Sequence, residues 1–319
     1  MPKVSVIVPV YNVEEYLEKS LDSLVNQTLE DIEIIVLNDG TKDNSQNIID
    51  RYRKKYPKKM ISIIKENEGV SITRNRGTDM AKGEYIFYAD SDDWMDITLL
   101  EKMYNHAQIH ASDIVVCDYY EVNESVLTSC QSINENISED ISKCFLLSNA
   151  CPWGKLFKLS YLRKTKLTFL ENHVYEDLAT IPGHAVFTSA ISHVKDPLYY
   201  YLIREGSIMR QPIYSKRLED IFDSIDRLYN IFKDNKKLED YKEEMEYLYI
   251  EHLLHAATLR FIKFDNYREN VNRIIDVMNT KFPNWKKNKY YAKHGIKYKI
   301  VCSLIMRNQI KLVKMLIKR

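Results

Sequence analysis

Runs of consecutive apolar residues, rich in β-branched side chains, recur through residues 1–119. Such runs are typical of strands buried on both faces, and they occupy residues 3–10, 32–37, 61–65, 85–89 and 114–119. Between the first four runs, apolar side chains at spacings of three and four predict helices at residues 14–27, 45–56 and 70–81. Because strands and helices alternate and the strands have no polar face, we expect an α/β fold with a mostly parallel, Rossmann-like sheet between helices.

The pattern changes further along the chain. Residues 121–142 are polar and predict an irregular, exposed excursion, whereas residues 198–203 predict a late strand. Beyond them the apolar spacing is helical, as in residues 241–264. We therefore expect a first domain of residues 1–212 and an α-helical C-terminal domain of residues 213–319.

The composition is that of an ordinary globular protein, with 45% hydrophobic and 29% charged residues among 319. The five cysteines have no CxxC spacing, which argues against a zinc site and a disulfide framework. The sequence shows neither a signal peptide nor an apolar run of membrane-spanning length. These features favour a cytoplasmic location.

The net charge of +1 hides an uneven distribution. Residues 286–319, here called the basic tail, contain eleven Lys and Arg and no Asp or Glu, which leaves 35 basic and 45 acidic residues elsewhere. One basic helical stripe is expected at Arg307, Lys311, Lys314 and Lys318. We expect this helix to pack on the acidic body, and the alternative is peripheral contact with the inner face of an anionic membrane.

Polar clusters follow four of the predicted strands, at residues 11–12, 38–40, 66–69 and 90–93. Parallel sheets bind ligands at the carboxyl ends of their strands. The sharpest cluster contains Asp90, Asp92 and Asp93, whose like charges raise one another's pKa values unless a cation is present. Oxygen ligands suit Mg²⁺ or Mn²⁺. The alternative is that Asp92 or Asp93 caps a helix at residues 96–106.

Four segments in order, VSVIVPVYN, LNDGTKDNS, NEGVSITRNRG and YIFYADSDD, cover about the first 95 residues. Together they resemble the N-terminal region of family 2 inverting glycosyltransferases, which have the GT-A fold and act on bacterial polysaccharide or glycoprotein glycans. The later segments WGKLF, YEDLA and YYYLIREGSIM are similar to further family segments. Asn38 departs from the family pattern, which often has an acidic residue there.

The resemblance implies a UDP-sugar donor, with galactose or glucose favoured, a glycan hydroxyl as acceptor, and Mn²⁺ or Mg²⁺ as cofactor. Asp39 would accept a hydrogen bond from the uracil ring, and Asp90 and Asp92 would form the DxD element around Ser91, with Asp92 as the direct metal ligand. The other implied contacts to the nucleotide or its diphosphate are Pro9, Tyr11, Asn12, Asn67, Arg74, Arg204 and Ser207.

An inverting transfer is a single displacement, so a base must take the proton of the acceptor hydroxyl. Asp90 and Asp92 are assigned to the donor, which leaves Glu176 and Asp177 as the best acidic pair. The resemblance points to Asp177 as the base and Glu176 as its neighbour. The alternative is that Asp177 caps a helix at residues 178–187.

Two other functions are compatible with an acidic crevice in such a fold. A sugar nucleotidyltransferase would also bind Mg²⁺, but it usually has a Gly-rich loop where this chain has Pro9 to Asn12. The other is a non-catalytic protein that binds nucleotide sugars. No nucleic-acid partner is expected.

Overall fold

The computed structural model describes residues 1–124, 126–204 and 214–317. The chain forms two compact units, Met1–Gln211 and Pro212–Arg319. The separate roles expected for residues 1–212 and 213–319 stay predictions.

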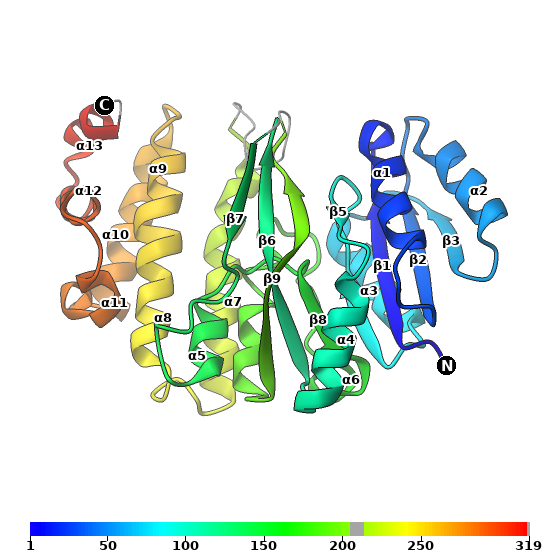
Figure 1. The fold of residues 1–319 in the computed structure, drawn as a ribbon. Coiled ribbons are helices and arrows are strands. Elements are labelled where there is room, and N and C mark those ends of the chain that lie inside the picture. Colours follow the sequence, from blue (N-terminus) through cyan, green and yellow to red (C-terminus); the bar gives the residue numbers. More distant parts are fainter. Residues whose placement is uncertain (125, 205–213, 318–319) are drawn as a thin grey trace. The chain divides into compact units, whose positions relative to one another are not determined.

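The first half of the sheet is parallel (Figure 1). Its order is β3-β2-β1-β4, with strands β1 (Val4–Val10), β2 (Ile32–Asp39), β3 (Met60–Lys65) and β4 (Tyr85–Tyr88). Helices α1 (Glu14–Val25), α2 (Ser45–Lys55) and α3 (Val70–Met80) connect these strands. Every residue of β1 and β2 is buried, as their apolar runs require. The α/β prediction is confirmed.

The second half of the sheet mixes parallel and antiparallel pairs. Strand β8 (Lys155–Lys158) runs antiparallel to both β4 and β6 (Ile114–Asn123), whereas β9 (Ile191–Leu202) is parallel to β6. The short strand β5 (Trp94–Met95) pairs with the end of β9. This pairing matters for function because it brings β9 beside the segment that follows β4. Helices α4 (Leu99–His110), α5 (Ile141–Leu146) and α6 (Leu159–Thr165) complete the unit.

Two local predictions are wrong. The irregular excursion expected at residues 121–142 is wrong for its first part, because β6 continues to Asn123 and β7 (Val126–Cys130) pairs with it as a hairpin, whereas residues 131–140 are irregular and mostly exposed. Val126 and Leu127 are both exposed on this hairpin, so its sequence lacks the alternation of a half-buried strand. Residues 178–187 form turns and a short 3₁₀-helix, Pro182–Val186, instead of an α-helix. Pro182 lacks the N–H that an α-helix interior needs.

The second unit is helical, as its periodicity predicts. Its core contains Tyr249, Leu253 and Leu254 from π-helical turns at Tyr249–Ala257. Among the described residues, no helix combines the length and the apolar character needed to cross a membrane. The α-helices of this unit are α7 (Asp220–Asp234), α8 (Lys242–Leu248), α9 (Thr258–Phe261), α10 (Tyr267–Lys281), α11 (Lys289–Ala292), α12 (Ile296–Met306) and α13 (Ile310–Ile317).

The single basic stripe expected in the tail is also wrong. Helix α12 ends at Met306, and Asn308 has a φ of 55°, so the chain turns before α13 begins. Arg307 therefore does not share a helix with Lys311 and Lys314, and Lys318 lies outside the described residues.

Helix α3 packs closely on the sheet at Gly77, where a Cβ atom would lie 2.4 Å from Ile7 Cγ2 and 3.2 Å from Leu37 Cδ1. We expect Gly77→Ala to lower the free energy of unfolding by about 1–3 kcal/mol, because overpacking outweighs the gain in helix propensity. Urea denaturation measures this change. Gly295→Ala is the control, since no atom lies within 4 Å of its added Cβ. Equal effects of the two substitutions would contradict the close packing.

Candidate active site

The loops after β1 and β2 are joined by the side chain of Asn12. Its Oδ1 accepts hydrogen bonds from the backbone N–H of Lys42 at 2.9 Å and the Thr41 hydroxyl at 3.1 Å. The backbone N–H of Asn12 donates to Thr41 Oγ1 at 2.8 Å. Pro9 is buried below this junction, whereas the ring of Tyr11 is exposed. The two loops therefore form one connected edge, with Tyr11 available for contact.

Asp39 is buried at the end of β2 and ties this strand to the loop before α3. Its carboxylate pairs with Lys65 and accepts the backbone N–H groups of Glu68 and Gly69, each at 2.9 Å. Asn67 is exposed in the same loop. The sequence pattern indicated Asp39 but not Lys65, which is the buried last residue of β3, an otherwise partly exposed strand at the edge of the sheet. The pair orders the loop that carries Asn67.

Gly40 allows these two loops to approach each other. Its φ is +72°, and a Cβ atom there would lie 2.8 Å from the backbone nitrogen of Asn67. A residue other than glycine would be strained and would push the loops apart.

Arg74 on α3 connects two acidic segments that are far apart in the sequence. Its Nη2 lies 2.8 Å from Asp90 Oδ1, and its Nη1 lies 2.8 Å from Glu176 Oε1, which is 102 positions away. The Arg74 side chain is only 6% exposed. Burial opposes its charge, but Asp90 and Glu176 outweigh this effect and raise the pKa of Arg74. The residue expected to face the nucleotide thus holds two carboxylates together.

The other acids of the cluster, Asp92 and Asp93, contact β9 and the residues that follow it. Ser91, between Asp90 and Asp92, is buried. Asp93 accepts hydrogen bonds from the Tyr199 hydroxyl at 2.7 Å and the backbone N–H of Leu202 at 2.8 Å. Asp92 accepts one from Nε of Arg204, also at 2.8 Å. Burial, together with the nearby charge of Asp90, raises the pKa of Asp92. The hydrogen bond and the charge of Arg204 act in the opposite direction without cancelling this shift.

The alternative that Asp92 or Asp93 caps the next helix is wrong. Helix α4 begins after Thr98, whose backbone N–H and hydroxyl both donate to Asp96 Oδ1. Strand β5 separates the cluster from this helix. Asp92 and Asp93 therefore turn toward β9.

An aromatic column supports the cluster. Trp153 stacks on both Tyr199 and Tyr201. Its ring centroid lies 4.7 Å from that of Tyr199 with an interplanar angle of 5°, and 5.3 Å from that of Tyr201 with an angle of 16°. The phenol of Tyr199 also accepts the backbone N–H of Asp90 at 3.3 Å. Sequence analysis missed the role of these rings, although the i, i+2 spacing of Tyr199 and Tyr201 in a strand places them on one face.

Asp177 follows Glu176 on the other side of Arg74. Burial, and then the charge of Glu176, raises the pKa of Asp177 to about 7, although Arg74 acts in the opposite direction. Asp177 Oδ1 accepts the backbone N–H of Leu178 at 2.7 Å. No α-helix follows for it to cap, so that alternative is wrong. A carboxyl group that titrates near neutral pH suits proton transfer.

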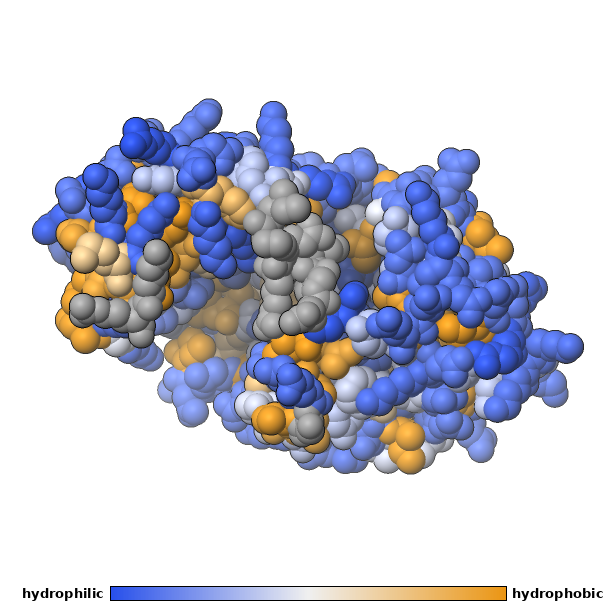
Figure 2. Space-filling model, turned by 90° about the horizontal axis from the view of Figure 1, so that it is seen from above, coloured by the Kyte–Doolittle hydropathy of each residue, from blue (hydrophilic) through white to orange (hydrophobic). Residues whose placement is uncertain are grey.

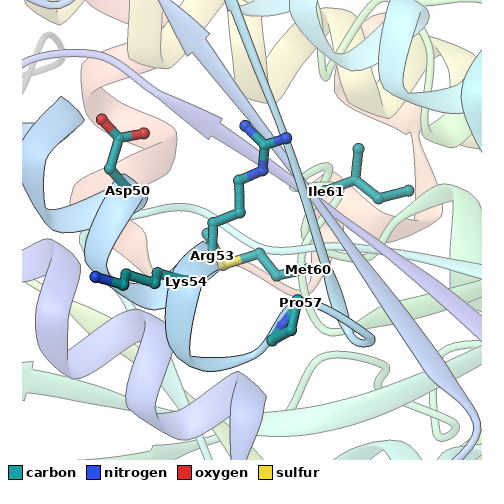
Figure 3. Close-up of a pocket in the computed structure, with 6 residues that line it drawn as sticks. All are labelled: Asp50, Arg53, Lys54, Pro57, Met60 and Ile61. Carbon is teal, nitrogen blue, oxygen red and sulfur yellow. The ribbon is translucent and has the colours of Figure 1, made fainter.

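The structure thus brings together most of the residues expected to act on the diphosphate and acceptor, while Ser207 lies outside the described residues. The described part of the chain has no group of three His, Cys, Asp or Glu residues able to hold a metal ion. Figure 3 shows a pocket at α2 and the start of β3, lined by Asp50, Arg53, Lys54, Pro57, Met60 and Ile61. It lies at the amino end of β3, away from these strand-end loops.

Comparison with known proteins adds to this geometry. Residues 5–166 match the family described as glycosyl transferase family 2. The chain belongs to this family. A relative from Bacillus subtilis that is named as a glycosyltransferase, EpsH, is 33% identical over 79% of this chain and 75% of its own. The poly(ribitol-phosphate) β-glucosyltransferase of Bacillus spizizenii is 34% identical over 65% of this chain and 33% of its own.

The fold of the enzyme is also shared with a solved structure. S. aureus TarS 1-349 in complex with UDP-GlcNAc superposes with a TM-score of 0.74 at 22% identity, covering 98% of this chain and 90% of that chain. This likeness confirms the predicted GT-A fold with its helical C-terminal region.

Lys65 and Asp39 form a buried ion pair, with side chains 4% and 5% exposed. We expect Lys65→Met to lower the free energy of unfolding by about 3–5 kcal/mol, because it leaves the Asp39 charge buried without its partner. The double variant Lys65→Met/Asp39→Asn should cost less than the sum of the single changes. Urea denaturation measures each value.

The control is Lys58→Met, at an exposed lysine of the same unit, which should change stability by less than about 0.5 kcal/mol. If Lys65→Met were as mild as this control, the buried pair would contribute little.

Proposed function

We propose that this glycosyltransferase moves a hexose, galactose or glucose, from a UDP-sugar to a hydroxyl of a glycan acceptor with inversion. The main support for the proposal is that one guanidinium group, that of Arg74, binds two carboxylates. These are Asp90 of the acidic loop and Glu176, the neighbour of Asp177. A donor-side acid and a candidate base thus lie on either side of one fixed group, as a single displacement requires.

The strand-end loops supply the proposed nucleotide site. Asp39 Oδ2 accepts one backbone N–H, from Gly69, and a carboxylate oxygen can accept a second hydrogen bond, here from the uracil ring. Pro9, Tyr11, Asn12 and Asn67 would line the base and ribose. The UDP-GlcNAc in TarS agrees with a uridine nucleotide, and glucosyl transfer is the activity named for the Bacillus spizizenii relative.

Asp92 and Asp90 would hold Mn²⁺ or Mg²⁺ together with the diphosphate. Their oxygen atoms fit such a cation, because Mg²⁺ is usually held by one or two carboxylates and substrate phosphates. The raised pKa of Asp92 agrees with this proposal, because a bound cation would stabilise the ionised carboxylate. A bound cation would neutralise charge on the leaving diphosphate. Arg204, close to Asp92, would add a second positive group, and Ser207 a polar contact.

Asp177 would act as the base. Its carboxylate takes the proton from the acceptor hydroxyl while the oxygen forms a bond to the anomeric carbon. The bond from that carbon to the UDP oxygen breaks, and its electron pair leaves with UDP. Attack opposite the leaving group inverts the anomeric carbon. Glu176, fixed by Arg74, would position the base and contact the acceptor.

The acceptor is proposed to be a cell-surface glycan, either a polysaccharide, a lipid-linked glycan or a glycoprotein. The poly(ribitol-phosphate) named for one relative is a polymer of this general kind. All five cysteines are free thiols, which suits a reducing cytoplasm. Release of UDP, instead of pyrophosphate, would separate this function from that of a sugar nucleotidyltransferase.

The pH profile tests the base. With a pKa of about 7 for Asp177, kcat/KM should rise as the pH increases through neutrality, because only the ionised carboxylate accepts a proton. Asp177→Asn should lower transfer by about 10²–10⁴-fold while UDP binding is kept. Asp79→Asn, at an exposed carboxylate of α3, is the control. A flat profile in the parent enzyme, or full activity of Asp177→Asn, would reject the assignment.

Removal of the metal tests Asp92. We expect Asp92→Asn to reduce UDP release by about 10²-fold or more at an unchanged melting temperature, because charge on the leaving diphosphate is no longer neutralised. EDTA should stop the parent enzyme, and added Mn²⁺ or Mg²⁺ should restore it. Asp31→Asn, at the opposite end of β2, should remain active. Full turnover in excess EDTA would argue against a metal.

A further inference from the structure

Helices α12 and α13 expose large apolar side chains that do not pack in the core of their unit. The inward residues of α12 are Val301, Cys302 and Ile305, and those of α13 are Ile310 and Val313, all of them buried. The outward apolar residues are Ile296, Ile300, Leu312 and Met315, which are 74%, 44%, 46% and 66% exposed.

These four residues are called the outward apolar group, and the helix geometry determines which of them are neighbours. Because an α-helix has about 3.6 residues per turn, Ile296 and Ile300 lie on one side of α12. Leu312 and Met315 are neighbours on α13 in the same way. The two helices pack against each other. In Figure 2 hydrophobic side chains lie open on the surface around the end of the chain.

Positive charge surrounds this group. Lys297 and Lys299 lie on either side of the line through Ile296 and Ile300, and Lys311 lies beside Met315. Residues 286–319 themselves contain no Asp or Glu, and the carboxylate that the structure shows beside α12, Glu251, accepts a hydrogen bond from Tyr298. A surface with apolar side chains at its centre and lysines on either side of them fits the interface of an anionic bilayer.

Other occupants fit less well. A second copy of the chain would bring two strongly basic surfaces together, which charge repulsion opposes. A soluble polyanion would pair with the lysines but would leave the exposed leucine, isoleucine and methionine side chains in water. Lipid satisfies both features, because headgroups pair with the lysines and acyl chains accept the apolar side chains.

We propose that α12 and α13 dock on an anionic membrane, with Ile296, Ile300, Leu312 and Met315 entering the headgroup region and the neighbouring lysines pairing with lipid phosphates. This surface differs from the single basic stripe expected from the sequence, because apolar side chains that enter the membrane lie at its centre. Docking does not depend on the donor or acceptor, so its failure would leave the proposed transferase function untouched.

Vesicle flotation of the full chain tests the proposal, with phosphatidylglycerol mixed into phosphatidylcholine in one arm and phosphatidylcholine alone in the other. The parent protein should float with the anionic vesicles only. Leu312→Gln/Met315→Gln and Ile296→Gln/Ile300→Gln should each reduce the bound fraction about tenfold or more, because apolar insertion is lost. Lys297→Gln/Lys311→Gln should reduce binding and its dependence on salt.

Ile109→Gln is the matched control, because Ile109 is 77% exposed on α4 of the other unit. It should float like the parent, and every variant should keep the parent's melting temperature and UDP release. Absence of flotation, equal binding to uncharged vesicles, or unchanged binding of both apolar double variants would overturn the proposal. A parent protein that is dimeric in gel filtration, with monomeric double variants, would do so as well.

Discussion

The pairing of the buried Arg74 guanidinium group with Asp90 and Glu176 is the interaction on which the proposed active site depends. It joins the acidic loop after β4 to the segment that contains Glu176 and Asp177, and neither segment pairs with the other through the sheet. A guanidinium suits this position because it stays charged when buried and presents two pairs of donors in one plane. The spacing between Asp90 and Glu176 is therefore set by one side chain on a helix.

Contacts with the sheet hold the acidic loop in place. Strand β9 runs beside β6 and reaches the acidic loop, where the hydroxyl of Tyr199 and the backbone of Leu202 hold Asp93. Trp153 closes the column of rings below. Asp93 is thus held by hydrogen bonds from β9, whereas Asp90 and Asp92 pair with Arg74 and Arg204. The three acids of this loop therefore have different partners, and Asp90 and Asp92 are the two that we propose to bind the ligand.

The sequence predicted the parallel strands because runs such as those of β1 and β2 are mostly apolar and do not alternate between apolar and polar residues. It also indicated Asp39, Asp90 and Asp92, because these stand at the ends of predicted strands, and Glu176 and Asp177, because they stand in a segment that resembles one of the family. It could not show that Arg74 meets Glu176, since no local pattern reports a contact across 102 positions. The β7 hairpin has no buried face, and the turn at Asn308 interrupts a periodicity that looked continuous.

The links between the strand-end loops have a consequence for how the enzyme meets its donor. Asn12 fastens the first loop to the second, and Asp39 fastens the second to the third, in each case through hydrogen bonds to backbone N–H groups. The three loops are therefore held to one another by the protein's own side chains. A nucleotide bound there, as we propose, would cost little conformational entropy in ordering these loops, so the free energy of recognition could be used for selectivity instead.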